Sequence, residues 1–139
     1  MKFFLSAIYI FYFGLIVGVS FLATPVKFRA SRLTLPIALE VGKETFHVFN
    51  KVEWGILILI IVVTFFIKKP HFQIFNLALF FLLAVGTFYL LPKLDQRIHL
   101  ILQGEQLARS SLHQFYVWGE MAKLVLCFFA AFLLQWKWS

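Results

Sequence analysis

The sequence is poor in cysteine and in charge. Its single cysteine, Cys127, cannot form a disulfide within the chain, and it excludes a metal site built from several thiolates. Charged residues make up only 14% of the 139 residues, whereas about a quarter of the residues in soluble domains are charged. Because 62% of the residues are hydrophobic, the composition excludes an ordinary soluble domain and predicts a membrane protein.

Acidic residues are scarcer still. Six Asp and Glu stand against 13 Lys and Arg, and the formal net charge is +7. Most of the cations stand beside the ends of hydrophobic runs, where anionic lipid headgroups attract them. We therefore expect the lipid bilayer, and no nucleic acid, as their partner. The sequence also lacks a phosphate-binding glycine loop, a catalytic-serine elbow and a paired-cysteine motif.

The hydrophobic residues fall into four stretches, and a helix needs about 20 apolar residues to cross a bilayer. Spans are predicted at residues 3–24, 46–67, 72–91 and 108–136. Two amphipathic connectors, residues 33–45 and 93–107, join them in pairs, and Pro25 and Pro92 are expected to close the first and third spans. The sequence thus predicts an all-α integral membrane four-helix bundle, multi-pass in the cell membrane. It forms one transmembrane domain over residues 1–139, with both connectors on one side and both termini on the other.

The fourth span carries polar residues along one helical face. They follow alternating steps of three and four residues: Gln106, Arg109, His113, Tyr116, Glu120, Lys123 and Cys127. At about 1.5 Å per residue, Lys123 and Glu120 lie roughly 20 and 24 Å from Trp136, inside a hydrocarbon layer about 30 Å thick. Charges that face lipid cost several kcal/mol each, so this face must point toward protein or water.

The second span has a comparable polar row. The apolar run from Trp54 to Ile67 is too short to cross the membrane alone, so the helix must also use residues 46–53, which places Glu53 inside the hydrocarbon. Helical steps link Glu40, Glu44, His47, Lys51 and Trp54, and Asn50 and Glu53 border this row. We expect the two rows to meet between spans 2 and 4 in an intramembrane polar seam.

The two halves of the chain resemble each other in outline. Pro25 precedes Glu53 by the same interval as Pro92 precedes Glu120, and each half reads as a span, a proline, a basic amphipathic connector and a span that begins with His and an acid. This pattern favours a two-fold internal repeat. Because each half has two spans, the pseudo-symmetry axis would run along the membrane normal.

The favoured function is that the polar seam binds or passes a small polar solute or a proton, or docks a partner. The candidate residues are His47, Asn50, Lys51, Glu53, Arg109, His113, Tyr116, Glu120 and Lys123. Alternatively, Glu120 with Lys123, and Glu53 with Lys51 or Lys123, only neutralise one another and fix the helix register. Whether the protein is an enzyme stays open at this point, as does its assembly with itself or with another membrane protein.

The histidines offer an oxidoreductase alternative. His47 and His113 could coordinate haem through two imidazoles or bind a transition metal ion. Glu44-x-x-His47 also matches the Glu-x-x-His of di-iron bundles, which need two copies of this motif. Ser110 stands at the corresponding position before His113, so the second copy is absent.

Two resemblances to known families follow from these residues. The pattern Gly18-x-x-Phe21-x-x-x-Pro25-x-x-Phe28-Arg29 at the end of the first span, with Leu112-His113 at the start of the last, resembles the small four-span family that contains transmembrane protein 205 and its bacterial relatives of unknown function. This resemblance implies a four-helix membrane fold and little chemistry. The present sequence differs in placing charged residues inside the second and fourth spans.

Asn50-Lys-Val-Glu53-Trp54 looks like the Asn-x-x-Glu-aromatic segment in the second span of the membrane-associated proteins in eicosanoid and glutathione metabolism. That resemblance implies a glutathione-type membrane transferase in which Asn50 and Glu53 help to hold glutathione. The later spans of that family carry arginine and tyrosine for the tripeptide, and spans 3 and 4 here have no Arg-x-x-Tyr.

Overall fold

The computed structural model describes residues 1–136, and all of its regular elements in this range are helical. The last three residues of the domain predicted for residues 1–139 lie outside the described range. In chain order, the elements are α1 (Lys2–Ile16), η1 (Val17–Ala23), α2 (Thr24–Lys27), α3 (Leu35–Ile67), α4 (Phe72–Val85), η2 (Gly86–Leu90), α5 (Leu91–Leu102) and α6 (Leu112–Trp136). The two η elements are π-helical segments inside longer helices.

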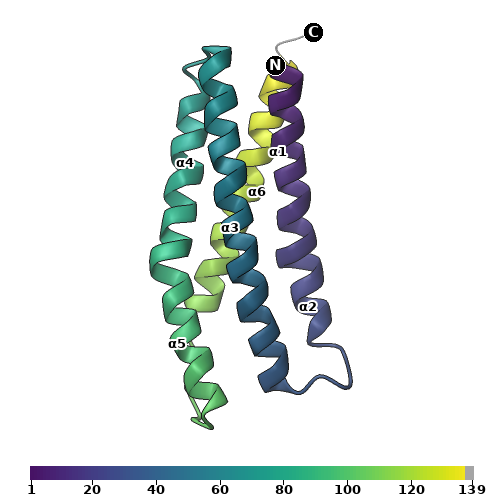
Figure 1. Cartoon of the computed structure of the whole chain (residues 1–139), viewed down its shortest axis with the longest axis vertical. Coiled ribbons are helices and arrows are strands. Elements are labelled where there is room, and N and C mark those ends of the chain that lie inside the picture. The colour runs from purple at the N-terminus through teal and green to yellow at the C-terminus, as the bar shows by residue number, and fades with distance from the viewer. Residues whose placement is uncertain (137–139) are drawn as a thin grey trace.

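Four continuous helices are long and apolar enough to cross a membrane. They are Lys2–Lys27, Leu35–Ile67, Phe72–Leu102 and Leu112–Trp136. The predicted all-α membrane bundle is therefore confirmed. The start of α1 and the end of α6 lie at one end of the bundle, the terminal end, and the α2–α3 and α5–α6 connections lie at the other, which we call the connector end (Figure 1).

The amphipathic connectors are helical, but they continue the spans instead of forming separate elements. Residues 35–45 are the first turns of α3, and α5 extends the third helix without a break. With 33 residues, α3 is about 50 Å long, well beyond the hydrocarbon thickness of about 30 Å. Upright in a bilayer, both helices would therefore be longer than the hydrocarbon is thick.

The two prolines do not close their helices, contrary to the sequence expectation. The first helix continues through Pro25 to Lys27, and the third continues through Pro92 to Leu102. In each case the proline lies at the second position after a π-helical segment. Proline has no backbone N–H to donate to a helical hydrogen bond. A π segment changes the hydrogen-bond pattern locally, so it can accommodate a residue without this donor. The two sites match in this respect, although the internal repeat itself stays a prediction.

The helices form a ring in which neighbours pack closely. The first helix packs most extensively against α6 and also against α3, while α4 packs against both α3 and α6. Helices α3 and α6 are absent from the closely packed pairs within residues 1–136, so they occupy diagonal positions. The polar seam therefore crosses the centre of the bundle, and side chains of α3 and α6 must reach across the diagonal.

The outer surface is strongly apolar. Large side chains such as Phe3, Phe88 and Trp118 are 82%, 75% and 74% exposed. A soluble monomer rarely exposes apolar surface on this scale, since water would favour its burial. Together with the four long helices, this surface shows a multi-pass protein whose surroundings are a lipid bilayer.

Candidate functional site

Three charged side chains meet at the centre of the bundle. Glu53 of α3 and Glu120 and Lys123 of α6 are 0%, 2% and 3% exposed. The Lys123 ammonium contacts Glu53 Oε1 across the bundle, and its Nζ lies 2.7 Å from Glu120 Oε1 within α6. We call these residues the charged cluster. The Lys123 ammonium thus contacts two carboxylates, one from each of two diagonal helices. All three groups are buried inside the bundle, away from lipid.

The first helix supplies a hydroxyl to each carboxylate. Tyr12 Oη donates to Glu53 Oε1 at 2.9 Å, and Ser20 Oγ donates to Glu120 Oε2 at 3.1 Å. Neither residue was among the predicted site residues, because a single hydroxyl-bearing side chain in an apolar helix is ordinarily a packing residue. The available signal was that Ser20 lies two helical turns after Tyr12, on the same face.

A second polar group borders the cluster at the π-helical turn of the third helix. Thr87 Oγ1 in η2 accepts from Asn50 Nδ2 at 2.9 Å and from Trp54 Nε1 at 3.0 Å, and it donates to Leu83 O at 2.7 Å. One hydroxyl therefore joins α3 to η2. The same hydroxyl accepts a hydrogen bond from the side-chain amide of Asn50, which lies one turn before Glu53.

The cluster borders two cavities. A small one of about 10 Å³ is lined by five of the predicted site residues: Asn50, Glu53, Tyr116, Glu120 and Lys123. A larger one of about 320 Å³, which we call the Glu120 cavity, extends toward the connector end past Ser20, Thr24 and His113. Glu120 lines both cavities, whereas Glu53 lines only the small one.

The remaining predicted residues lie outside the charged cluster. His47 is half-buried, and its Nε2 lies 2.5 Å from Asp95 Oδ2 of α5. Six residues separate His47 from Glu53, which at about 100° per residue turns their side chains to different faces of α3. Lys51 and Arg109 are exposed, and Arg109 precedes the start of α6 at Leu112. The predicted polar row of the last span is thus helical only from His113 onward.

No three His, Cys, Asp or Glu side chains within residues 1–136 lie close enough together to hold a metal ion. The predicted pair does not meet in the charged cluster, since His47 pairs with Asp95 and His113 is an exposed residue at the Glu120 cavity. Haem or metal at His47 and His113 therefore stays a prediction from the sequence.

The contacts of Asn50 and Glu53 bear on the glutathione alternative. In the structure they bind Thr87 and Lys123, so a ligand held by both residues would have to displace these contacts. Displacing the lysine would leave buried carboxylates without their cation, which is costly. The geometry therefore favours a role for the charged cluster itself.

Comparisons with known proteins give no match to this chain. The chain matches no protein-family model, and neither the curated proteins nor the solved structures contain a match to it. Any assignment of function therefore depends on the geometry of the charged cluster and its cavities.

Proposed function

We propose that this multi-pass protein of the cell membrane binds a proton at the charged cluster and exchanges it with the connector side. The observation that carries the proposal is that two buried carboxylates share one ammonium, and one of them lines a cavity that extends toward the connector end. Intramembrane acids and bases of this kind are typical of proton relays and ion pathways.

The charge balance supports proton binding. With Glu53, Glu120 and Lys123 all ionised, the cluster has one more negative than positive charge. A net charge is expensive in a water-poor interior, because little solvent is present to stabilise it. One proton shared by the two carboxylates removes that imbalance. The hydroxyls of Tyr12 and Ser20 remain as donors to whichever carboxylate is ionised.

The route of exchange runs through Glu120. This residue lines the Glu120 cavity together with Ser20, Tyr116 and His113, all on the connector side of the cluster. Glu53 is fully buried and contacts Lys123 and Tyr12. A proton that enters through the cavity therefore reaches Glu120 first, and Glu53 through the shared ammonium or through the small cavity that both carboxylates line.

Infrared difference spectroscopy tests the proposal. Acidifying the wild-type protein in lipid vesicles should produce a carboxylic-acid C=O band, and Glu120→Gln or Glu53→Gln should each remove much of it, since the proton is shared. Glu105→Gln is the matched control, because Glu105 is an exposed acid in the α5–α6 connection. Circular dichroism should show an unchanged helix content.

Two outcomes would overturn proton binding at the cluster. One is a band that persists in full in both Glu120→Gln and Glu53→Gln. The other is a spectral response to Na⁺ at constant pH with none to acid, which would assign the balancing charge to a metal cation. Either result would leave the membrane fold intact, because that rests on the helices and their apolar surface.

Membership of the four-span family that contains transmembrane protein 205 also stays a proposal. The observed four-helix membrane architecture agrees with it, but many unrelated membrane proteins share this architecture. The residues that distinguish this chain from that resemblance, Glu53, Glu120 and Lys123, are the ones on which the proposed function rests.

A further inference from the structure

A third cavity lies at the connector end, outside the charged cluster. It has a volume of about 240 Å³ and is lined by residues of α2, α3 and α5, of the segment that leads into α6 and of the first turn of α6. The cavity occurs where α3 and α5 extend beyond the first turn of α6, so that one side of the ring lacks a helix (Figure 1). We call it the basic cavity.

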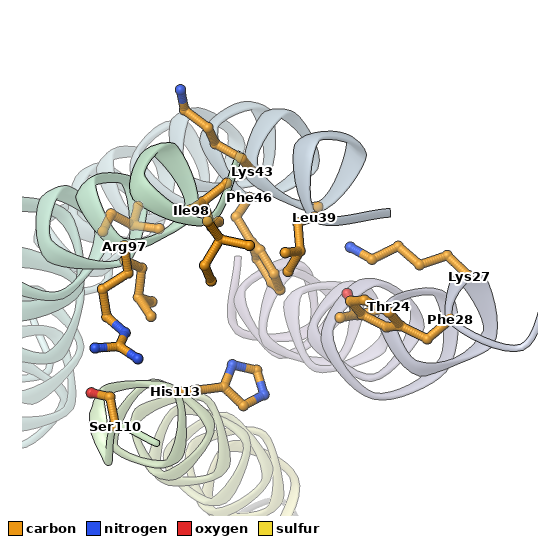
Figure 2. Close-up of a pocket in the computed structure, with 14 residues that line it drawn as sticks. Thr24, Lys27, Phe28, Leu39, Lys43, Phe46, Arg97, Ile98, Ser110 and His113 are labelled. Atoms are coloured by element: carbon orange, nitrogen blue, oxygen red, sulfur yellow. The ribbon is translucent and has the colours of Figure 1, made fainter. Parts of the chain in front are cut away.

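The charged residues that line the basic cavity are all cations: Lys27, Lys43 and Arg97. None of the three takes part in an ion pair within residues 1–136, where the acidic partners are Glu53, Asp95 and Glu120. Figure 2 shows Lys27 and Arg97 reaching toward the cavity from opposite sides, His113 between them, and the Lys43 ammonium pointing away. The cavity therefore presents two cations without an anion.

Local geometry holds the two cationic groups in place. Arg97 Nη2 donates to Ala108 O at 2.6 Å, which ties the guanidinium to the segment before α6. Lys27 Nζ lies 5.1 Å from the ring centre of Phe28 and 5.7 Å from that of Phe46. The ammonium also lies over Gly42 of α3, where an added Cβ would collide with it. A glycine at this position permits that close approach.

Apart from Thr24, Ser110 and His113, the rest of the lining is apolar. Leu39, Leu91, Leu94, Ile98 and Ile101 form much of the wall, contributed by α3 and α5. A hydrophilic anion gains nothing from such a wall, whereas an acyl chain does, because burying apolar surface is favourable. Cations beside an apolar wall at a membrane boundary match the two parts of an acidic lipid.

We propose that the basic cavity binds one anionic membrane lipid. Its phosphate lies between Lys27 and Arg97, and its acyl chain lies along the apolar wall of α3 and α5. The charged cluster itself is not part of this site, because Glu53, Glu120 and Lys123 do not line the basic cavity. The basic cavity and the Glu120 cavity are neighbours that share four lining residues: Thr24, Phe28, Phe46 and His113.

Native mass spectrometry of the full chain, released from nanodiscs, tests the proposal. Nanodiscs containing phosphatidylglycerol should yield protein with one retained phosphatidylglycerol, whereas those made only of phosphatidylcholine should not. Lys27→Gln and Arg97→Gln should each weaken retention by about fivefold, since one cation near an anionic headgroup has roughly that effect. The double variant should weaken it by about 25-fold, since the two effects multiply.

The controls separate this site from general attraction by positive charge. Arg32→Gln removes an exposed cation of the α2–α3 connection that does not line the basic cavity, so this variant should retain the lipid. Glu120→Gln should also retain it, which distinguishes failure of this proposal from failure of proton binding. If the double variant does not fold, Lys27→Gln alone decides, because Lys27 forms no ion pair in the described part of the chain.

Three results would overturn the proposal. Equal retention of phosphatidylcholine would show that the cations do not distinguish an anionic headgroup from a zwitterionic one. Equal losses in Arg32→Gln and Lys27→Gln would show that only net charge matters. Displacement of the lipid by inorganic phosphate at comparable concentration would show that the cavity takes a free anion and that its apolar wall contributes nothing.

Discussion

At the scale of single residues, Lys123 is the side chain on which the bundle centre depends most. Among residues 1–136 it is the one cation in contact with both Glu53 and Glu120, and all three are buried. Removing one partner from a buried ion pair leaves an uncompensated charge, which costs far more than the intact pair contributes. Lys123 therefore matters chiefly because its loss would leave two buried carboxylates without a compensating positive charge.

We predict that Lys123→Met lowers the free energy of unfolding in detergent by about 3–5 kcal/mol, because two carboxylates lose their buried cation. Combining it with Glu53→Gln and Glu120→Gln should restore most of the loss, since no buried charge then remains. Denaturant unfolding followed by circular dichroism measures both. A single variant as stable as the wild type would contradict the buried arrangement.

Tyr12 provides a smaller test at the same site. Its hydroxyl donates to Glu53 Oε1 at 2.9 Å, and it is 1% exposed. Tyr12→Phe should cost about 1–3 kcal/mol, since a buried carboxylate loses a donor that water cannot replace. Tyr89→Phe is the matched control, because that hydroxyl pairs with Lys93 at the surface and its loss should have little effect.

The small cavity beside the cluster leads to a third residue-scale prediction. Glu53 Oε2 and Tyr116 Oη are buried without a protein hydrogen-bond partner, and both residues line a cavity of about 10 Å³. That volume is about the minimum for one water molecule, which needs polar partners of this kind. We expect an ordered water within hydrogen-bond distance of both oxygens in an experimental map. Direct contact between these two oxygens would refute it.

At the scale of elements, the spans and the buried part of each polar row were accessible from sequence, because helical periodicity shows which residues share a face. Tyr116, Glu120, Lys123 and Cys127 are all buried on one side of α6. Periodicity does not tell which helices are neighbours, so the diagonal placement of α3 and α6 could not be read from it. Nor could the pairing of His47 with Asp95, which depends on where α5 lies.

The continuation of two helices through proline was also hidden from the sequence. Proline ordinarily ends or kinks a helix, and the sequence alone does not show that a π-helical segment precedes Pro25 and Pro92. The second of these segments has a clear structural role. Its Thr87 hydroxyl binds Asn50 and Trp54, so the π-helical turn joins the third helix to α3.

We predict that Thr87→Val destabilises the contact between η2 and α3. The substitution keeps the shape of the side chain but removes the acceptor for Asn50 Nδ2 and Trp54 Nε1, at a cost of about 1–3 kcal/mol. Denaturant unfolding in detergent measures the loss, and Trp54 fluorescence should shift as its N–H loses its partner. Thr45→Val, whose hydroxyl binds Val41 O within α3, should change neither. Equal effects of the two substitutions would contradict a role for Thr87 between helices.

At the scale of the whole molecule, the two ends of the bundle differ in chemistry. The connector end has the basic cavity and the Glu120 cavity, both lined by His113. Between the charged cluster and the terminal end, polar contacts among the described residues include neutral pairs, such as Tyr9 with Asn76 and Gln135 with Ser6. Buried apolar residues such as Ile60 and Leu79 belong to the core around them. We therefore expect water and ions to reach the cluster from the connector side alone.

Cysteine labelling tests this one-sided access, and the chain suits the method because its only native cysteine, Cys127, is 0% exposed. With a membrane-impermeant maleimide, His113→Cys and Lys69→Cys should be labelled from opposite faces of sealed vesicles. Val117→Cys, in the Glu120 cavity, should react from the same face as His113→Cys, whereas Asn76→Cys should react from neither. Labelling of positions 113 and 69 from one face would overturn the four-span topology. Labelling of Asn76→Cys from the face of Lys69→Cys would instead show that the cluster is open to both sides, and would turn a one-sided binding site into a path across the membrane.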